Sequence, residues 1–371
     1  MVRFQGGAVN FRPPRYTART PPTRRGPEAT PALTPDRFGA LREFATRNLK
    51  DEALVLAPAS ADASFRSYWR AQPEDSARSG SWIVMDAPPG KEDLGSWLDV
   101  AHRLRAAGLN APEVLAEDRE QGFVLMSDLG TRTYLAELAD DTAETLYADA
   151  LDALHLMQTR TATPGLPPYD ESRLIRELEL FPEWFLRRHL GLTPSCDEWE
   201  SIERTFGILV ASALEQPRAF VHRDYHSRNL MVVEAANPGI IDFQDAVVGP
   251  VTYDLVSLLR DCYIAWPEAR VAAWSEGYRD RLVAAGMLSA GETRWPRWFD
   301  LMGLQRHIKV LGIFCRLCYR DGKDGYLGDL PLVLRYALRV AARYPELAPF
   351  GDWLRARVGE RDLTRTLETV A

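Results

Sequence analysis

The chain has 371 residues, of which 46% are hydrophobic and 26% are charged, and its formal net charge is −7 at pH 7. This length suits about two domains. No apolar run approaches the ~18 residues that a membrane helix needs, and the first residues lack the apolar segment of a secretory signal. We therefore expect a soluble, cytoplasmic protein that neither spans nor binds a membrane.

The charge is unevenly distributed along the chain. Residues 1–30 carry six arginines and a single acid, Glu28, a local net charge of +5 that leaves −12 for the rest. An acidic body argues against a nucleic-acid surface as the main function. Residues 1–36 are rich in proline and poor in periodic apolar residues, so we expect a disordered tail. A nucleic-acid-binding or lipid-binding role of this tail alone, or a start site assigned too early, stays open.

Residues 37–126 are expected to form a small lobe built on an antiparallel sheet. Three short β-type runs come first, followed by a run with helical spacing that ends at Gly108, a residue typical of the position after a helix. Two more β-type runs complete the lobe. The expected strands are 53–57, 64–71, 81–87, 113–117 and 123–126, and the expected helix is 94–107.

Residues 127–371 are expected to form a large, mostly helical lobe. One stretch, 220–243, interrupts the helical pattern with short β-type runs and a turn at 237–239. The chain is therefore predicted to have a bilobal α+β fold. The expected helices are 131–138, 142–159, 172–189, 197–214, 251–263, 268–285, 297–319 and 330–344.

The polar part of this interrupted stretch carries the residues that phosphoryl transfer needs. Asp224 and Asn229 are five residues apart on a predicted loop, and Asp242 follows at the end of an apolar run. Phosphoryl transfer uses one carboxylate to accept the proton of the attacking hydroxyl, and an amide and a second carboxylate to hold Mg²⁺ against the phosphates. Each residue alone suits a turn or a helix cap, but the combination favours a phosphotransferase site. His222 is expected to fix the loop by hydrogen bonds.

Longer motifs around these residues resemble a known family. His222, Asp224 and Asn229 at this spacing, together with 241–243 and 249–255, are similar to the aminoglycoside phosphotransferase and choline kinase branch of the protein-kinase-like fold. Further segments resemble, more narrowly, the bacterial N-acetylmuramate/N-acetylglucosamine anomeric kinases of cell-wall (peptidoglycan) recycling. These segments are 62–66, 85–89, 127–134, 242–246, 257–261 and 305–312, and the likeness runs from about residue 37 onward.

The resemblance implies a bilobal kinase-like fold, with ATP and Mg²⁺ as cofactors and a role for several residues. Asp224 would be the catalytic base for the anomeric hydroxyl of the sugar, and Asn229 and Asp242 would hold Mg²⁺. The residues that would bind the nucleotide are Ser127, Asp128 and Leu129 at adenine, and Ser64 and Arg66 in a turn over the phosphates.

The small lobe departs from the general kinase pattern in two ways. The expected phosphate-covering turn, 61–66, has no glycine, and the strand at 82–86 has no lysine for the α- and β-phosphates. Arg66 or Lys91 would have to supply the missing positive charge, and Arg66 is preferred because it follows the turn. A non-catalytic, ATP-binding pseudokinase is therefore an alternative interpretation.

The charge of the acceptor gives a second indication. A polycationic aminoglycoside would be met by carboxylates, whereas the lactyl carboxylate of N-acetylmuramate would be met by Arg or Lys. Lys309, Arg316 and Arg320 recur on one helical face, one turn after Arg306, although this spacing alone fits a solvated face equally well. The family-like run 305–312 favours acceptor contact. The expected substrate contacts are His226, Arg228, Arg260, Asp261, Arg306 and Lys309.

The function that the resemblance implies is phosphorylation of the anomeric hydroxyl of N-acetylmuramate and N-acetylglucosamine by ATP, giving the α-1-phosphate. The expected partner is the small sugar, with no nucleic acid and no membrane, and a monomer is expected. The alternatives are a kinase for another small alcohol or an aminoglycoside, and the pseudokinase. A protein kinase is disfavoured, because no Ala-Pro-Glu element or activation segment follows Asp242.

Overall fold

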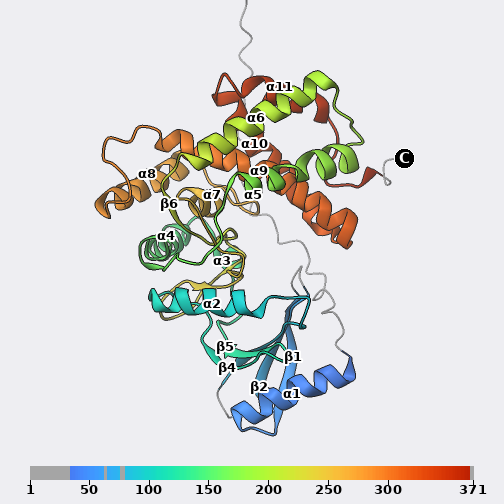
Figure 1. Ribbon diagram of the computed structural model, residues 1–371, viewed down its shortest axis with the longest axis vertical. Helices are drawn as coiled ribbons and strands as arrows, with labels where there is room; N and C mark the ends of the chain where they lie inside the picture. Colours follow the sequence, from blue (N-terminus) through green and yellow to red (C-terminus); the bar gives the residue numbers. More distant parts are fainter. Residues whose placement is uncertain (1–33, 62–64, 76–79, 368–371) are drawn as a thin grey trace, which may run out of the picture. The chain divides into compact units, whose positions relative to one another are not determined.

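The computed structural model describes residues 34–61, 65–75 and 80–367 of the chain (Figure 1). The backbone divides into two compact units. The first unit comprises Met1–Glu92 and Glu120–Leu125, and the second comprises Asp93–Arg119 and Met126–Ala371. The expected division of the chain after residue 126 stays a prediction. The expectation of a disordered tail falls almost wholly on residues 1–33, which lie outside the described residues.

The predicted antiparallel sheet is present, with all five expected strands. Its strand order is β1-β2-β3-β5-β4. Strands β1 and β2 pair antiparallel, with Leu56 opposite Ala71, and β2 and β3 pair antiparallel, with Trp69 opposite Val84. The strands are β1 (Leu54–Ala61), β2 (Ser67–Pro73), β3 (Trp82–Asp86), β4 (Val114–Asp118) and β5 (Phe123–Ser127).

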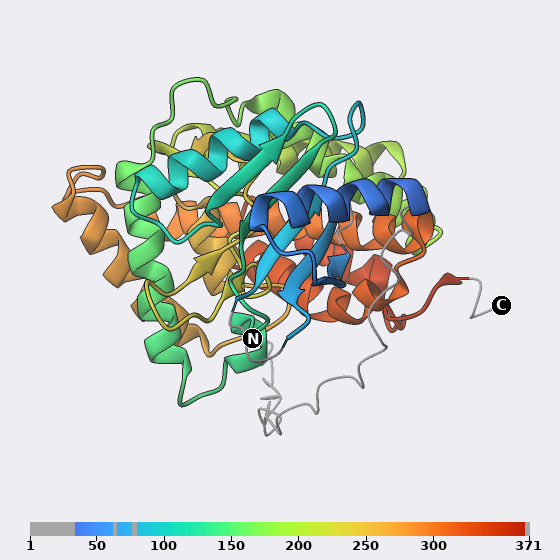
Figure 2. The same cartoon turned by 90° about the horizontal axis from the view of Figure 1, so that it is seen from below.

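A helix that was not predicted, α1 (Pro35–Leu49), lies against those strands of the sheet that belong to the first unit (Figure 2). Thr34 caps its N-terminus by accepting a hydrogen bond from the backbone N–H of Arg37, and Pro35 occupies the first helical position. One face of the helix packs on aromatic rings of the sheet: Phe38 on Trp69 at 4.8 Å and Phe44 on Phe123 at 5.8 Å between ring centroids.

A buried ion pair ties α1 to the third strand. Asp86, at the end of β3, is only 1% exposed. The Nε of Arg37 donates to its two carboxylate oxygens at 3.0 and 3.1 Å, and the Nη2 of Arg37 also donates to the carbonyl of Gln121 at 2.8 Å. The guanidinium further lies over the ring of Phe123, 4.9 Å from its centroid. Arg37 therefore neutralises a carboxylate that has little access to water.

The substitution Arg37→Met is expected to destabilise the first unit by about 3 kcal/mol, because it leaves the buried carboxylate of Asp86 without its cation. Thermal unfolding of the full chain measures the effect as a drop in the unfolding midpoint. Arg42→Met, at an exposed position of the same helix, is the matched control and should change stability by less than about 0.5 kcal/mol. Equal midpoints for the two variants would contradict this assignment.

The second unit is mostly helical, as predicted for residues 127–371. The expected helix 94–107 is present, with Asp93 capping its N-terminus through the backbone N–H groups of Gly95 and Ser96. The helices are α2 (Leu94–Ala106), α3 (Tyr134–Glu137), α4 (Ala143–Arg160), α5 (Glu171–Leu178), η1 (Phe181–His189), α6 (Cys196–Leu214), α7 (Tyr253–Leu259), α8 (Glu268–Ala284), α9 (Trp295–Asp321), η2 (Asp324–Asp329), α10 (Leu330–Arg343) and α11 (Ala348–Val358).

The expected single helix over 172–189 is wrong, because the structure has two helices there. An α-helix, α5, ends at Leu178, and a π-helix, η1, begins at Phe181 and contains Pro182. The central helix α9 packs against this region, and Gly312 allows the close approach. A Cβ atom at Gly312 would lie 2.4 Å from the carbonyl carbon of Leu180. The wider π-helical turn thus follows the point where two backbones touch.

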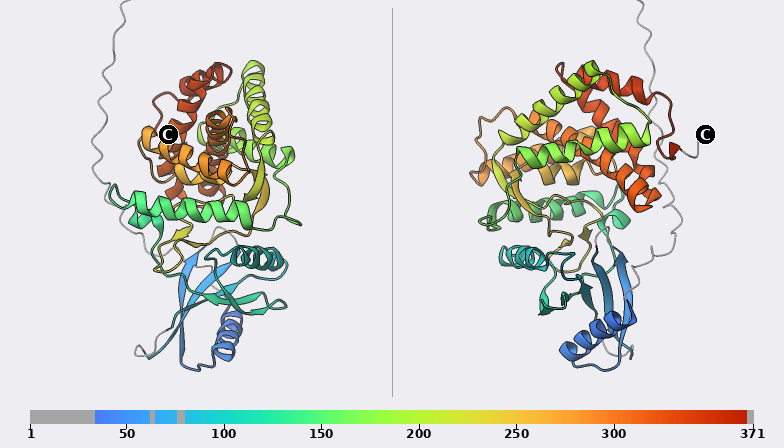
Figure 3. Two further views of the ribbon diagram at one scale, coloured as in Figure 1. Left: turned by 90° about the vertical axis from the view of Figure 1, so that its left-hand side faces the viewer. Right: turned by 45° about the vertical axis from the view of Figure 1, so that its right-hand side comes forward.

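Helix α9 is the core of the second unit (Figure 3). It packs against α5, η1, α6, α7, η2 and α10, and most of its residues are buried, including the charged Arg306 and Lys309. Among the described residues, none of the helices combines the length and the apolar character that crossing a bilayer requires.

Two small β ladders interrupt the helices and hold the polar segment singled out above. Strand β6 (Arg218–Val221) pairs antiparallel with β9 (Val247–Pro250), which was not predicted. Strand β7 (Leu230–Met231) pairs with β8 (Gly239–Ile240) in the predicted hairpin. The chain between β6 and β7, residues 222–229, is called the polar loop below.

Candidate active site

The backbone of the polar loop is fixed by two buried carboxylates from α7 and the residues after it. Asp254 accepts hydrogen bonds from the backbone N–H groups of His222 at 2.6 Å and Arg223 at 3.0 Å. Arg223 has a φ of +79°, a left-handed conformation that is uncommon for a residue other than glycine. At the other end of the loop, Asp261 accepts from the backbone N–H of Ser227 at 2.9 Å. The backbone strain at Arg223 is of a kind that persists where surrounding contacts impose it, and such strain is frequent at functional sites.

Asp224 presents a carboxylate from this fixed loop, and 39% of its side chain is exposed. The Nη1 of Arg306 lies 3.8 Å from its Oδ1. Burial alone would raise the pKa of Asp224, but the charges of Lys309 and Arg306 outweigh burial and hold the pKa below its ordinary value. The carboxylate is therefore ionised at neutral pH and can accept a hydrogen bond from a hydroxyl group.

His222 acts on the loop rather than as a base. Its ring is fully buried, and burial lowers its pKa to about 4, so the ring is neutral at neutral pH. Its Nδ1 accepts a hydrogen bond from the backbone N–H of Asp224 at 3.2 Å. This contact orients the peptide that carries the Asp224 side chain, as expected from the sequence.

The structure brings Asn229 and Asp242 together beside Asp224. The Nδ2 of Asn229 donates to the Oδ2 of Asp242 at 3.2 Å and to the backbone carbonyl of Asp224 at 3.0 Å. The backbone N–H of Ile241 donates to the carbonyl of Asn229 at 3.1 Å, which joins the two residues at the base of the β7–β8 hairpin. Asp242 has a φ of +65°, a second left-handed residue at this point. The three residues predicted from spacing therefore share one site.

The chemistry of this donor set fits a magnesium ion. Among the residues that the structure describes, no cluster of three or more His, Cys, Asp or Glu side chains could hold a metal by itself. A Mg²⁺ ion that is also bound by substrate phosphates needs only one or two protein carboxylates, with hard oxygen ligands. The carboxylate of Asp242 and the amide oxygen of Asn229 supply such ligands.

A network of buried charges underlies the polar loop, and the sequence analysis did not identify its central residue, Glu177 of α5. Glu177 pairs with the Nζ of Lys309 at 3.1 Å and with the guanidinium of Arg223. The Nζ of Lys309 also donates to the hydroxyl of Tyr253 at 3.0 Å. Burial alone would raise the pKa of Glu177, but the charges of Lys309 and Arg223 lower it below its ordinary value. The network joins α5, α7 and α9 to the loop.

Arg306 and Lys309, expected as substrate contacts, lie inside this network. They are 3% and 5% exposed. The Nη1 of Arg306 donates to the backbone carbonyl of Arg223 at 2.9 Å. The predicted basic stripe on α9 therefore has its first two members buried beneath the loop, while Arg320 near its end is exposed and pairs with Asp321. Both side chains have protein partners beneath the loop, and their expected contact with a sugar stays a prediction.

Arg260 and Asp261, also expected as substrate contacts, are buried by protein partners. Arg260 pairs with Asp300 at 2.8 Å, and its guanidinium stacks on Phe299. Asp261 accepts hydrogen bonds from the backbone N–H and the hydroxyl of Ser227 and from the backbone N–H of Tyr263. Both side chains thus hold the protein itself.

His226 and Arg228 stand on the polar loop next to Asp224. The ring of His226 packs edge-on against Tyr263, 5.4 Å between centroids, and burial lowers its pKa. The guanidinium of Arg228 lies over the face of Tyr263, 3.6 Å from its centroid, and 42% of the Arg228 side chain is exposed. Of the basic residues expected at the substrate, Arg228 is the one that the structure leaves accessible at the loop.

The residues expected to bind adenine form a tight turn after β5. The Oγ of Ser127 accepts a hydrogen bond from the backbone N–H of Glu113 at 2.8 Å, and the Oδ1 of Asp128 accepts from the N–H of Gly130 at 2.9 Å. Leu129 packs on Gly239 of β8, where an added Cβ would lie 3.0 Å from its Cδ1. The turn is therefore built with its backbone conformation fixed.

The residues expected to cover the phosphates belong to the first unit, and Ser64 lies outside the described residues. Arg66 is buried, and its Nε lies 3.8 Å from the Oε2 of Glu92. Glu92 also accepts a hydrogen bond from the backbone N–H of Phe65 at 2.9 Å. Lys91, the other candidate for the missing charge, lies over the ring of Phe65. Glu92, which precedes α2, was not singled out from the sequence.

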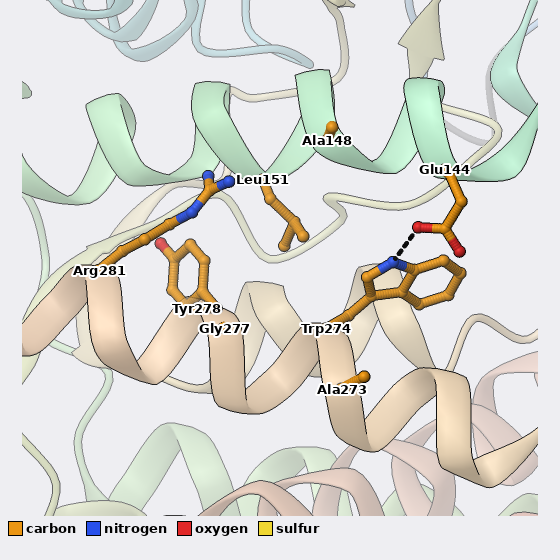
Figure 4. A pocket seen from close by; sticks show the side chains of 8 residues that line it. All are labelled: Glu144, Ala148, Leu151, Ala273, Trp274, Gly277, Tyr278 and Arg281. Carbon is orange, nitrogen blue, oxygen red and sulfur yellow. Dashed lines mark hydrogen bonds between the residues drawn. The ribbon is translucent and has the colours of Figure 1, made fainter.

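A pocket between α4 and α8 is separate from these residues (Figure 4). Its two charged side chains already have partners. Glu144 accepts hydrogen bonds from the Nε1 of Trp274 at 3.0 Å and the Nε of Arg270 at 2.7 Å, and Arg281 pairs with Asp152. None of its lining residues belongs to the polar loop, so the pocket carries no part of the candidate chemistry.

Comparisons with known proteins agree with this geometry. Residues 55–291 match the model of a protein family described as the phosphotransferase enzyme family (APH). The chain belongs to the phosphotransferase enzyme family. The resemblance stated from the motifs is therefore confirmed, and so is the phosphotransferase class that it implies.

Two curated members of the family are similar over most of their length. The N-acetylmuramate/N-acetylglucosamine kinase of Pseudomonas aeruginosa is 50% identical over 300 residues, which cover 81% of this chain and 87% of that protein. The protein of the same name from Neisseria meningitidis is 41% identical over 310 residues, covering 82% of this chain and 91% of its own.

Solved structures of low sequence identity share the predicted kinase-like fold. A choline kinase from Cryptosporidium parvum matches with a TM-score of 0.58 at 10% identity, covering 85% of this chain and 99% of that one. The ADP-bound aminoglycoside phosphotransferase APH(2'')-Ib matches with a TM-score of 0.52 at 14% identity, covering 82% and 98%. At such low identity these likenesses concern the fold alone.

Proposed function

We propose that this member of the phosphotransferase enzyme family is a sugar kinase that transfers the γ-phosphoryl group of ATP to the anomeric hydroxyl of N-acetylmuramate and of N-acetylglucosamine. The product would be the α-1-phosphate, formed in peptidoglycan recycling. One observation carries the proposal: Asp224, Asn229 and Asp242 meet at one polar loop, in a chain that is 50% identical to a kinase of this name. Because ATP is a cytoplasmic substrate, the protein would act in the cytoplasm. We further propose that it acts as a monomer, without nucleic acid or membrane.

In the proposed reaction, Asp224 accepts the proton of the anomeric hydroxyl as its oxygen bonds to the γ-phosphorus, and the bond from that phosphorus to the β–γ bridging oxygen breaks to release ADP. The ring oxygen of the sugar withdraws electron density, which makes this hydroxyl more acidic than the others. A carboxylate of lowered pKa can therefore accept this proton and orient the hydroxyl. Orientation of the attacking group is the main contribution that phosphoryl transfer needs from the protein. No covalent intermediate with the protein is required.

Asn229 and Asp242 would hold Mg²⁺, which neutralises charge on the phosphates when it is bound. Their mutual hydrogen bond and the left-handed backbone conformation of Asp242 keep both side chains at the base of the β7–β8 hairpin. Gln244 supports this arrangement, because its Nε2 donates to the Oδ1 of Asp242 at 2.8 Å.

The nucleotide contacts are proposed for each unit separately. In the second unit, the backbone of Ser127, Asp128 and Leu129 would bind adenine. In the first unit, Arg66 would supply the charge that the missing strand lysine supplies elsewhere, with Glu92 in the place of its acidic partner, and Ser64 would contact phosphate.

The test is ADP release by the purified full chain with ATP, Mg²⁺ and a panel of acceptors. We expect turnover of N-acetylmuramate and N-acetylglucosamine and none of the methyl glycoside of N-acetylglucosamine, whose anomeric oxygen is blocked. Choline and gentamicin, bound or used by structural neighbours, should not be phosphorylated. Turnover of the methyl glycoside, or of choline or gentamicin in place of the free sugars, would overturn the proposal. If none of the acceptors in the panel gives ADP release, the result supports the non-catalytic alternative.

A further inference from the structure

The two proposed acceptors differ in one charged group. N-acetylmuramate carries a lactyl ether with a carboxylate on C3, where N-acetylglucosamine has a hydroxyl. In a chain with a net charge of −7, this lactyl carboxylate needs a local cation to bind. A guanidinium binds a carboxylate best because it can donate two parallel hydrogen bonds. The structure narrows down which cation is available at the site.

Most cations around the polar loop already have buried protein partners. Arg223 and Lys309 pair with Glu177, and Arg260 pairs with Asp300. Arg306 donates to the loop backbone and is only 3% exposed. These groups cannot turn to a ligand without leaving a buried carboxylate or carbonyl unpaired.

Arg228 differs from them in exposure and in the type of contact. Its side chain is 42% exposed, and its Nη2 lies 3.9 Å from the Oδ2 of Asp329, beyond hydrogen-bond distance. Beside this long ion pair, the guanidinium stacks on two rings, 3.6 Å from the centroid of Tyr263 and 5.7 Å from that of Tyr326. Stacking orders the plane of a guanidinium and leaves the N–H groups along its edge directed outward within that plane.

The fold of the loop brings the backbone on both sides of Arg228 close to that of Asp224. The backbone N–H of His226 donates to the carbonyl of Asp224 at 3.0 Å, and that of Asn229 donates to the carbonyl of His226 at 2.9 Å, so residues 224–229 fold back on themselves. C1 and C3 belong to the same pyranose ring. A group that binds the C3 substituent while Asp224 faces the C1 hydroxyl must therefore lie within one sugar ring of Asp224, as this compact loop allows.

A second observation supports a ligand at the same place. His226 is 9% exposed, and its Nδ1 has no hydrogen-bond partner among the described residues. Buried polar atoms are seldom left unpaired, and those that are need an explanation. A polar group of a bound sugar beside Tyr263 would provide the missing partner.

We infer that Arg228 binds the lactyl carboxylate of N-acetylmuramate and sets the preference of the protein between its two acceptors. The inference rests on the proposed function. It makes Arg228 a specificity-determining residue: the guanidinium contributes to binding of the acid sugar and makes no charged contact with the neutral one.

The test compares kcat/KM of Arg228→Gln and wild type for both sugars, since N-acetylglucosamine serves as an internal control. We expect kcat/KM for N-acetylmuramate to fall about 10- to 100-fold, mostly through KM, the size expected for a lost charge-assisted hydrogen bond. The value for N-acetylglucosamine should change less than about threefold. Arg228→Lys, which keeps the charge, should recover part of the preference for N-acetylmuramate. If Arg228→Gln does not fold, the ratio of kcat/KM for the two sugars is measured on Arg228→Lys instead.

Arg320→Gln is the matched control, because this arginine is 54% exposed near the end of α9 and pairs with its neighbour Asp321. It should leave both sugars unaffected. Equal losses for the two sugars in Arg228→Gln, or an unchanged ratio, would overturn the inference while leaving the proposed function intact. A wild-type chain that phosphorylates neither sugar would overturn the proposed function, and the inference with it.

Discussion

Asp224→Asn is expected to lower kcat by about 10²- to 10⁴-fold with a folded chain, because an amide cannot accept the proton of the attacking hydroxyl. The two side chains have the same shape, and the Asp224 side chain is 39% exposed, so we expect a folded chain that loses part of the stabilisation from the charges of Lys309 and Arg306. The fixed backbone of the loop does not depend on this carboxylate, since Asp254 and Asp261 anchor it. ADP release at saturating ATP and N-acetylmuramate measures kcat, and the thermal unfolding midpoint verifies the fold.

The control for this prediction is Asp280→Asn, an exposed aspartate on α8 whose partner is the adjacent Arg279. It should retain wild-type kcat. If Asp224→Asn turned over sugar as fast as Asp280→Asn, the base would have to be another group, and the measured activity of the wild type would need re-examination for a contaminating kinase.

Glu177→Gln is expected to destabilise the second unit by about 3 to 5 kcal/mol, the cost of breaking a buried ion pair by removing one partner. The substitution leaves two cations, Arg223 and Lys309, without their shared carboxylate. Because Arg223 is also the left-handed residue that precedes Asp224, kcat should fall together with stability. Thermal or urea unfolding measures the stability. Glu179→Gln, two residues further at an exposed position, should change it by less than about 0.5 kcal/mol.

The pH dependence of this effect has a definite sign. The folded-state pKa of Glu177 is lowered from its ordinary value of 4.5 by Lys309 and Arg223, which outweigh burial. The stabilisation is therefore complete above 4.5 and is lost as the pH falls through the lower folded-state value. The difference in unfolding free energy between wild type and Glu177→Gln should be constant near neutral pH and shrink on acidification. A difference that grew on acidification would contradict the ion-pair assignment.

The core of the candidate site could be predicted from sequence because its chemistry is local. Asp224 and Asn229 lie on one short loop, and Asp242 follows at the end of the next hairpin, so the three were assigned to one site from the sequence. The structure has a hydrogen bond of 3.2 Å between Asn229 and Asp242. The strands of the sheet were equally accessible, since short β-type runs are separated by clear turn signals.

The support of the site could not be predicted, because it depends on which face of each helix is buried. Arg306 and Lys309 have the spacing of a solvated or ligand-binding stripe, yet α9 is surrounded by other helices and both residues lie inside. Glu177 looked like any acidic residue on an amphipathic helix, and only the packing of α5 against α9 and the polar loop gives it partners.

Helix α1 and the break between α5 and η1 were missed for different reasons. The apolar stripe of α1 is short, although Thr34 followed by Pro35 is a start signal that could have been used. The break after Leu178 depends on the approach of the α9 backbone at Gly312, a contact between segments more than a hundred residues apart, which no local pattern contains.

Phosphorus NMR of the product identifies the phosphorylated position. It therefore tests directly whether the anomeric hydroxyl of the sugar is the acceptor. The product formed by the full chain from ATP and N-acetylmuramate is isolated, and the coupling of its phosphorus to sugar protons is recorded. We expect coupling to the anomeric proton of an α-1-phosphate and loss of the reducing end. Coupling to the two C6 protons, with the reducing end intact, would mean that a different hydroxyl faces Asp224 and would contradict phosphorylation at the anomeric position.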